Sequence, residues 1–135
     1  MVGHEPGVSP STPLSVDYPP ATQDLHHEVE LVVALAHGGS NLSENEAMSK
    51  VFGYAVGLDL TRRDLQDQAK DKRRPWTSAK MFASSAPCSP VVPLEDIGPS
   101  HPTEGRIWLT VDGEVKQDSD IVRVYGHLHT RLACL

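Results

Sequence analysis

With 135 residues, the chain is long enough for one domain but not for two. Its 18 acidic and 12 basic residues give a formal net charge of -6, which argues against a nucleic-acid partner because binding phosphates needs a basic surface. No apolar run approaches the roughly 20 residues that span a bilayer, and no signal peptide is visible, so we expect a cytoplasmic protein with no membrane partner.

Prolines dominate the first 23 residues, where they stand among Ser, Thr and Gly. Proline removes a backbone donor and blocks a regular helix or a central strand. This segment is therefore predicted to be a loop or a disordered tail. The prolines are Pro6, Pro10, Pro13, Pro19 and Pro20.

A strand is predicted next, from about His27 to Ala36, where a Gly-Gly pair ends it. Side chains alternate along a strand, so Glu28 and Glu30 would lie side by side on one face. Two like charges that close repel each other unless water or a cation compensates them, which points to a metal site. The same alternation is also typical of the solvated face of a half-buried sheet. The opposite face is predicted to be buried and carries Val29, Leu31, Val33 and Leu35.

A capping box follows, in which Ser43 and Glu46 begin a short helix that runs to about Lys50. Residues 51–60 again have a strand pattern, with Phe52, Tyr54, Val56 and Leu58 on one face. Asp59 at the end of this strand supplies a third carboxylate. Three carboxylates without a nearby Cys or His ligand suit a hard divalent cation such as Mg²⁺, Mn²⁺ or Ca²⁺. Alternatively, Asp59 is a strand-end residue that bonds nearby backbone.

The second half of the chain is predicted to contain one helix and one hairpin. Residues 64–72 are polar and compatible with a helix, which Pro75 ends. Residues 81–102 are rich in Ser and Pro and should form loops and short strands. Residues 106–111 and 114–117 are two strand-like runs joined by Asp112-Gly113, a strong signal for a hairpin turn. The fold class is therefore α+β, mostly β.

Three ordered motifs strongly resemble the fumarylacetoacetate hydrolase family: His26–Val33, Gly53–Gln66 and Pro75–Phe82. The likeness is closest to the branch that hydrolyses fumarylpyruvate and other acylpyruvates. It implies a partial form of the family's mixed β-sheet fold, with short helices, over residues 17–121. Residues 1–16 and 122–135 are then divergent tails. Family members commonly dimerise, so the resemblance also implies a homodimer.

The resemblance assigns roles to six residues. Glu28, Glu30 and Asp59 would bind Mg²⁺ or Mn²⁺, with Ca²⁺ as a further candidate. Arg63 and Gln66 would hold the carboxylate or keto oxygens of a diketo acid substrate. Lys80 would lie beside the metal-bound substrate as a substrate-binding and catalytic group. Without the motif, Lys80 would be interpreted as an ordinary solvated lysine, and Arg63 as the start of a charged helix.

The implied chemistry explains these residue types. Cleavage of fumarylpyruvate to fumarate and pyruvate leaves an enolate, whose charge a divalent cation stabilises as a Lewis acid. Lys80 would add positive charge at the same oxygens. The planar guanidinium of Arg63 can bind a carboxylate and fix its orientation.

Both ends of the chain depart from the family pattern. The family's water-activating His–Glu pair lies upstream, and we do not assign His4 and Glu5 this role because sequence neighbours do not share a helix face. His26 and His27 flank the first motif and are given a structural role, and His127 and His129 are not assigned to a metal. We therefore expect a truncated or frame-shifted copy with low or no hydrolase activity alone. The alternatives are a non-catalytic metal-binding or subunit-interaction remnant, or an isomerase or decarboxylase of the same family.

Overall fold

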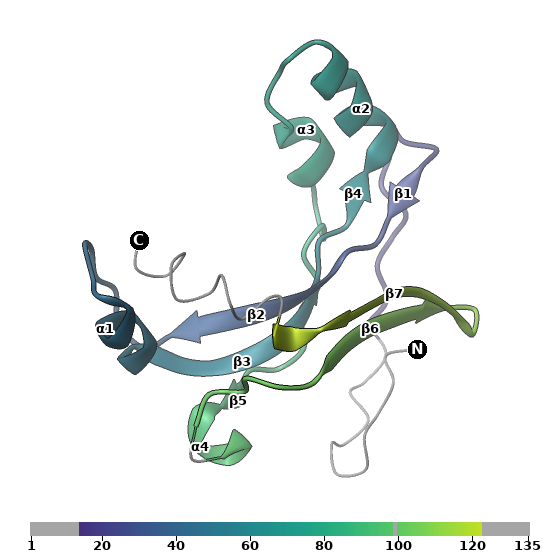
Figure 1. Cartoon of the computed structure of the whole chain (residues 1–135). Helices are drawn as coiled ribbons and strands as arrows, with labels where there is room; N and C mark the ends of the chain where they lie inside the picture. The colour runs from purple at the N-terminus through teal and green to yellow at the C-terminus, as the bar shows by residue number, and fades with distance from the viewer. Residues whose placement is uncertain (1–13, 99, 123–135) are drawn as a thin grey trace. The chain divides into compact units, whose positions relative to one another are not determined.

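The structure, a computed structural model, describes residues 14–98 and 100–122 (Figure 1). The predictions for His4, Glu5, His127 and His129, and for most of both tails, lie outside the described residues. Strands outweigh the short helices within the described part, which confirms the predicted α+β fold dominated by sheet. No helix in residues 14–98 or 100–122 is long and apolar enough to cross a membrane.

The described elements are β1 (Leu25–His26), β2 (Val29–Leu35), α1 (Glu44–Ser49), β3 (Val51–Leu58), β4 (Thr61–Arg62), α2 (Arg63–Asp71), α3 (Thr77–Lys80), β5 (Val92–Pro93), α4 (Leu94–Ile97), β6 (Arg106–Val111) and β7 (Glu114–Asp120). The strands form a three-stranded sheet in the order β2-β3-β5 and the two-stranded sheets β1-β4 and β6-β7. The chain divides into two compact units. The first unit contains residues 31–56 and the described residues from 90 onward, and the second contains the described residues up to 30 and residues 57–89.

The first unit holds a small apolar core beneath α1. Ala47, Met48, Val51 and Tyr54 are buried together there. Partly buried residues pack against them: Leu31, Val33, Leu42, Leu94 and Ile121. The predicted capping box that starts α1 is confirmed, since the Ser43 backbone N–H donates to Glu46 Oε2 at 2.8 Å and the Ser43 side chain accepts from the Glu46 backbone N–H.

Strand β5 pairs closely with β3, and glycine makes this possible. Gly53 lies opposite Pro93 in the antiparallel register, and Tyr54 lies opposite Val92. A Cβ atom at Gly53 would clash with the carbonyl oxygen of Val92. The predicted hairpin is also confirmed, because Asp112 and Gly113 have φ angles of 52° and 82° between β6 and β7. These positive values are typical of the type I′ turn that Asp-Gly favours.

Two details of the strand predicted over residues 27–36 are wrong. Strand β2 begins at Val29 rather than His27, and Leu35 is 39% exposed rather than buried. The reason is that β2 is an edge strand of its sheet and Leu35 is its last residue. In β3, Tyr54 is buried, whereas Phe52 and Val56 on the same face are 50% and 38% exposed. The alternation in the sequence therefore predicted which side chains share a face of the strand, but not how deeply each one is buried.

Candidate metal centre

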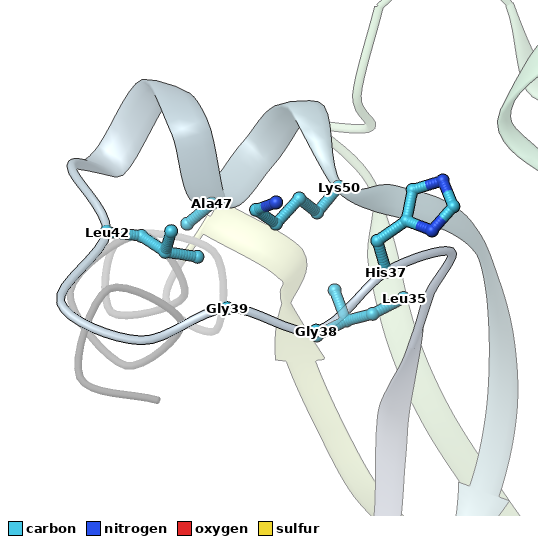
Figure 2. A pocket seen from close by; sticks show the side chains of 7 residues that line it. All are labelled: Leu35, His37, Gly38, Gly39, Leu42, Ala47 and Lys50. Atoms are coloured by element: carbon cyan, nitrogen blue, oxygen red, sulfur yellow. The ribbon is translucent and has the colours of Figure 1, made fainter.

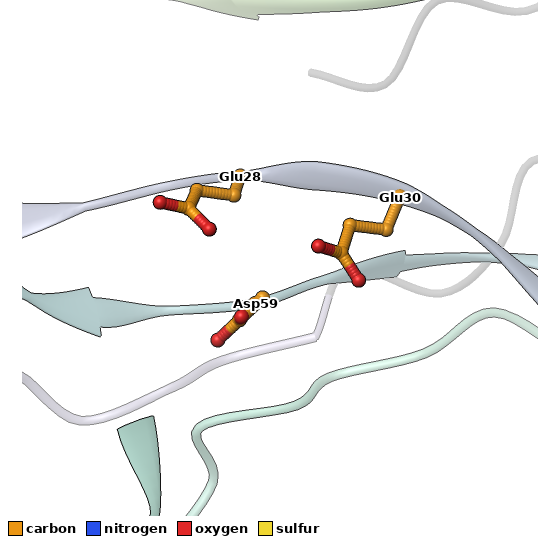
Figure 3. Close-up of side chains that lie close together, drawn as sticks. All are labelled: Glu28, Glu30 and Asp59. Carbon is orange, nitrogen blue, oxygen red and sulfur yellow. The ribbon is translucent and has the colours of Figure 1, made fainter. Parts of the chain in front are cut away.

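Glu28, Glu30 and Asp59 form a cluster of carboxylates in the second unit (Figure 3). Glu28 directly precedes β2, Glu30 lies within it, and Asp59 directly follows β3. The Asp59 backbone N–H donates to the Glu28 carbonyl oxygen at 2.8 Å, which fixes the two segments side by side. Each residue offers one carboxylate oxygen, and these oxygens lie within 4.8 Å of one another. The two glutamates project from the same side of the ribbon toward Asp59, as Figure 3 shows.

Lys80, at the end of α3, joins two of these carboxylates. Its Nζ donates to Glu28 Oε2 and to Asp59 Oδ2, both at 2.7 Å. The lysine side chain is 21% exposed, so this ion pair is only partly solvated. An ammonium group carries three N–H donors, and one of them therefore remains for an oxygen of a bound ligand.

Arg63, the first residue of α2, is held from three directions. Its Nη2 donates to Glu28 Oε1 at 2.5 Å, and its Nη1 donates to Gln66 Oε1 at 2.5 Å. Its Nε donates to His26 Nδ1 at 3.2 Å. Gln66 is buried at 3% exposure, one turn further along α2. The guanidinium plane is therefore fixed beside the carboxylate cluster.

The charges at the site are strongly coupled. Partial burial alone would raise the pKa of Glu28, but hydrogen bonds and charges from Lys80 and Arg63 outweigh it and hold that pKa below its usual value. Burial alone would lower the pKa of Lys80, but hydrogen bonds to Asp59 and Glu28 outweigh it and raise that pKa. Both groups are thus charged at neutral pH. Two positive charges, those of Arg63 and Lys80, thus lie beside the carboxylate cluster.

This donor set fits a hard divalent cation. All three candidate ligands are carboxylates, and hard cations such as Mg²⁺ and Mn²⁺ prefer oxygen ligands. A divalent cation would add positive charge that an anionic ligand can offset, so the site is suited to a cation and a carboxylate bound together.

The N-terminus of α2 is anchored to the segment before β1 by Asp64. Its Oδ1 accepts a hydrogen bond from Thr22 Oγ1 at 2.6 Å, and its Oδ2 accepts one from the Gln23 backbone N–H at 3.1 Å. The hydrogen bond from Thr22, followed by that from Gln23, holds the pKa of Asp64 below its usual value.

We predict that Asp64→Asn lowers thermal stability at pH 7 and that this loss disappears in acid. A carboxyl group whose pKa is depressed by folding stabilises the protein above its unfolded pKa of about 4. That contribution is lost as the pH falls through the lower, folded pKa. Thermal melts of both proteins between pH 7 and pH 2.5 measure the difference, with the exposed Asp67→Asn as the control. A difference that stays constant across this range contradicts the assignment.

A pocket in the first unit has a different character (Figure 2). It lies at the end of β2 and against α1, and its lining is mostly apolar. None of the residues that line it carries a carboxylate, so it offers no ligands for a hard cation. The lining residues are Leu35, His37, Gly38, Gly39, Leu42, Ala47 and Lys50.

The structure brings together all six residues that the sequence singled out: Glu28, Glu30, Asp59, Arg63, Gln66 and Lys80. Sequence reasoning assigned His26 a general structural role and did not find its contact with Arg63. The signal available was its position two residues before Glu28, which places both on one face of an extended segment. Asp24, which lies 3.0 Å from His26 Nε2, was missed altogether.

The chain matches known proteins over most of its length. The family model "Fumarylacetoacetate (FAA) hydrolase C-terminal" matches residues 4–135. A fumarylpyruvate hydrolase from a Ralstonia species is 40% identical over 121 residues, which are 90% of this chain and 62% of the relative. The mitochondrial oxaloacetate tautomerase FAHD1 of Rattus norvegicus is 49% identical over 100 residues, which are 74% of this chain and 44% of the relative.

Solved structures agree with this match. The crystal structure of a fumarylpyruvate hydrolase from Pseudomonas aeruginosa, in complex with Mn²⁺ and pyruvate, is similar with a TM-score of 0.75 and 44% identity. The similarity covers 86% of this chain and 47% of that one. The chain thus spans about half the length of most of the relatives it matches.

Proposed function

The chain belongs to the fumarylacetoacetate hydrolase family, and we propose that it carries the metal- and keto-acid-binding residues of a hydrolase that cleaves acylpyruvates such as fumarylpyruvate. The observation that carries this proposal is the carboxylate cluster of Glu28, Glu30 and Asp59, with Lys80 hydrogen-bonded to two of its members. We propose Mg²⁺ or Mn²⁺ as the cation, and the complex of the Pseudomonas relative with Mn²⁺ and pyruvate supports it. When bound, the cation would supply Lewis-acid stabilisation of an enolate.

Arg63 and Gln66 would bind and orient the keto acid. Three of the five N–H donors of Arg63 are used within the site, which leaves one on each terminal nitrogen. Two such donors can bind a carboxylate in a bidentate manner. Because Gln66 Oε1 accepts from Arg63, its amide NH₂ group is left to donate to a substrate oxygen. Both side chains present donors, as an anionic substrate requires.

Lys80 would stabilise negative charge that develops at the substrate oxygen. Hydrogen bonds to Glu28 and Asp59 hold its ammonium at the site before a cation or a substrate arrives. A positive charge placed where negative charge develops makes a large contribution to catalysis. The catalytic role of Lys80 is therefore electrostatic, at the same oxygen that the cation would contact.

Hydrolysis also needs a base that activates water. His26 does not suit this role, because Nδ1 accepts from Arg63 and Nε2 lies against Asp24. The expectation that this chain alone hydrolyses its substrate slowly is part of the proposal, and the chain should bind a cation and a keto acid. A homodimer, as is common in the family, is part of the same proposal.

A tautomerase acting on a keto acid such as oxaloacetate is the second candidate. The observation that favours it is the 49% identity to the Rattus oxaloacetate tautomerase over 74% of this chain. Tautomerisation and carbon–carbon cleavage both pass through an enolate beside a carboxylate. The same cation site, Arg63 and Lys80 would serve either reaction, so their geometry alone does not separate the two.

The test is a pair of assays with Mn²⁺-loaded protein, backed by calorimetric titration of oxalate, a mimic of the chelating end of a keto acid. We expect Mn²⁺-dependent oxalate binding together with slow release of pyruvate from fumarylpyruvate. Interconversion of oxaloacetate tautomers without pyruvate release would favour the tautomerase, and oxalate binding without either reaction would favour a non-catalytic remnant. Absence of Mn²⁺-dependent oxalate binding would contradict the proposal.

A further inference from the structure

Arg63 contacts a His–Asp pair that the proposed chemistry does not use. Its Nε donates to His26 Nδ1 at 3.2 Å, and His26 Nε2 lies 3.0 Å from Asp24 Oδ1. All three residues belong to the second unit. These side-chain contacts therefore lead from the Asp24 carboxylate through the His26 imidazole to the Arg63 guanidinium, which would bind the substrate.

The chemistry of these side chains decides which atom donates and which accepts. A guanidinium can only donate, so His26 Nδ1 must accept and carries no proton. The proton of the neutral ring is then on Nε2, 3.0 Å from the Asp24 carboxylate. The network thus assigns one tautomer to His26 and leaves neither nitrogen available for a substrate.

Backbone pairing places the three residues together. His26 in β1 lies opposite Thr61 in the antiparallel register with β4, and the Arg63 backbone N–H donates to the Asp24 carbonyl oxygen at 2.8 Å. Asp24 and His26 are two residues apart in an extended segment, so their side chains share a face. The short sheet β1-β4 therefore brings the imidazole to Arg63 and the carboxylate to the imidazole.

His26 completes the immobilisation of the Arg63 guanidinium. Gln66 and Glu28 hold its two terminal nitrogens, and His26 holds the third. Because all three of its nitrogens are hydrogen-bonded, the guanidinium group cannot rotate about the terminal bonds of the side chain. The two remaining N–H groups then point in fixed directions, which spares the ligand the entropic cost of ordering a long side chain.

We propose that His26, oriented by Asp24, is a positioning residue that presets the Arg63 guanidinium for the carboxylate of the keto acid. This role rests on the proposed function. It acts through Arg63 and not on the cation, so it should affect affinity for the organic anion more than affinity for the metal. Because the His26 side chain is 46% exposed, its replacement should leave the fold intact.

The test compares His26→Ala, His26→Asn and His26→Gln by calorimetry, with Mn²⁺ alone and then with oxalate on the Mn²⁺-loaded protein. The Asn side-chain oxygen can occupy the position of Nδ1, whereas the Gln amide lies one bond further out. We expect His26→Ala and His26→Gln to raise the Kd for oxalate about 3- to 10-fold, with His26→Asn close to wild type. The Kd for Mn²⁺ should change little in all three, and the exposed His37→Ala is the control for loss of a histidine.

Nitrogen-15 NMR of the histidine side chains, on the wild-type protein without metal, reports the tautomer independently. We expect the proton of His26 on Nε2, and a proton on Nδ1 would overturn the proposal. Equal oxalate affinity in His26→Ala and wild type would also overturn it while leaving the proposed function standing. If wild type binds neither Mn²⁺ nor oxalate, the proposed function fails and the positioning role with it.

Discussion

Replacing Glu28 and Glu30 together by glutamine should abolish binding of oxalate in the presence of Mg²⁺ or Mn²⁺. The double variant removes two of the three carboxylates that converge within 4.8 Å. Loss of a partner in the outer shell of a metal site already costs about 10- to 100-fold in affinity. Loss of two charged ligands should therefore raise the Kd for the cation by more than about 100-fold. Calorimetric titration with Mn²⁺, followed by oxalate, measures both affinities.

The matched control is Asp67→Asn combined with Asp71→Asn on the exposed side of α2. It removes the same amount of charge from the same unit, so a general electrostatic effect would appear in both double variants. The Kd for Mn²⁺ should therefore differ between the two double variants by more than about 100-fold. Unchanged Mn²⁺ affinity in Glu28→Gln with Glu30→Gln would refute the assignment of the metal site.

Glu28 complicates this experiment because it also accepts hydrogen bonds from Lys80 and Arg63. Its replacement leaves both cations without that partner and can lower stability. Glu30→Gln alone is a second variant, and a thermal melt of each protein separates loss of binding from loss of folding. If Glu30→Gln melts like wild type and has lost the cation, the defect is in the site itself.

The local part of the site could be predicted from the sequence. Glu28 and Glu30 at alternate positions, and Asp59 after the next strand, follow from strand geometry and from the pairing of consecutive strands. The capping box at Ser43 and the Asp-Gly turn were predictable for the same reason, since each depends on a few neighbouring residues.

The rest of the site depends on contacts between residues that are far apart in the sequence. Lys80 is 52 positions from Glu28, and no periodicity in the sequence links the two. Helix α3, which carries Lys80, has four residues, too few for a helical pattern to be visible. Its first turn is closed by hydrogen bonds to the Trp76 carbonyl oxygen. The resemblance to a family supplied Lys80 as a candidate, and only the folded chain gave it two carboxylate partners.

Lys80→Met should destabilise the metal-free protein and tighten its binding of the cation. In the absence of metal, the ammonium of Lys80 is the cation that Glu28 and Asp59 share. Exposed ion pairs contribute at most about 1 kcal/mol, whereas removing one partner of a buried pair costs about 3–5 kcal/mol. For a lysine side chain that is 21% exposed, we expect a loss of about 2 kcal/mol in the free energy of unfolding. Methionine keeps most of the length of the side chain without its charge, so packing should change little.

Metal should reverse this loss, because a cation that binds only the folded state stabilises it in proportion to its affinity. Saturating Mn²⁺ should therefore raise the melting temperature of Lys80→Met by more than that of wild type, and calorimetry should give the lower Kd to the variant. Lys70→Met is the control, since Lys70 pairs with Asp67 at 3.1 Å on the exposed side of α2. Equal stabilisation of Lys80→Met and wild type by Mn²⁺ would mean that the lysine does not compete with the cation. Lys80 would then act on the substrate alone, and its hydrogen bonds to Glu28 and Asp59 would persist in the metal-bound protein.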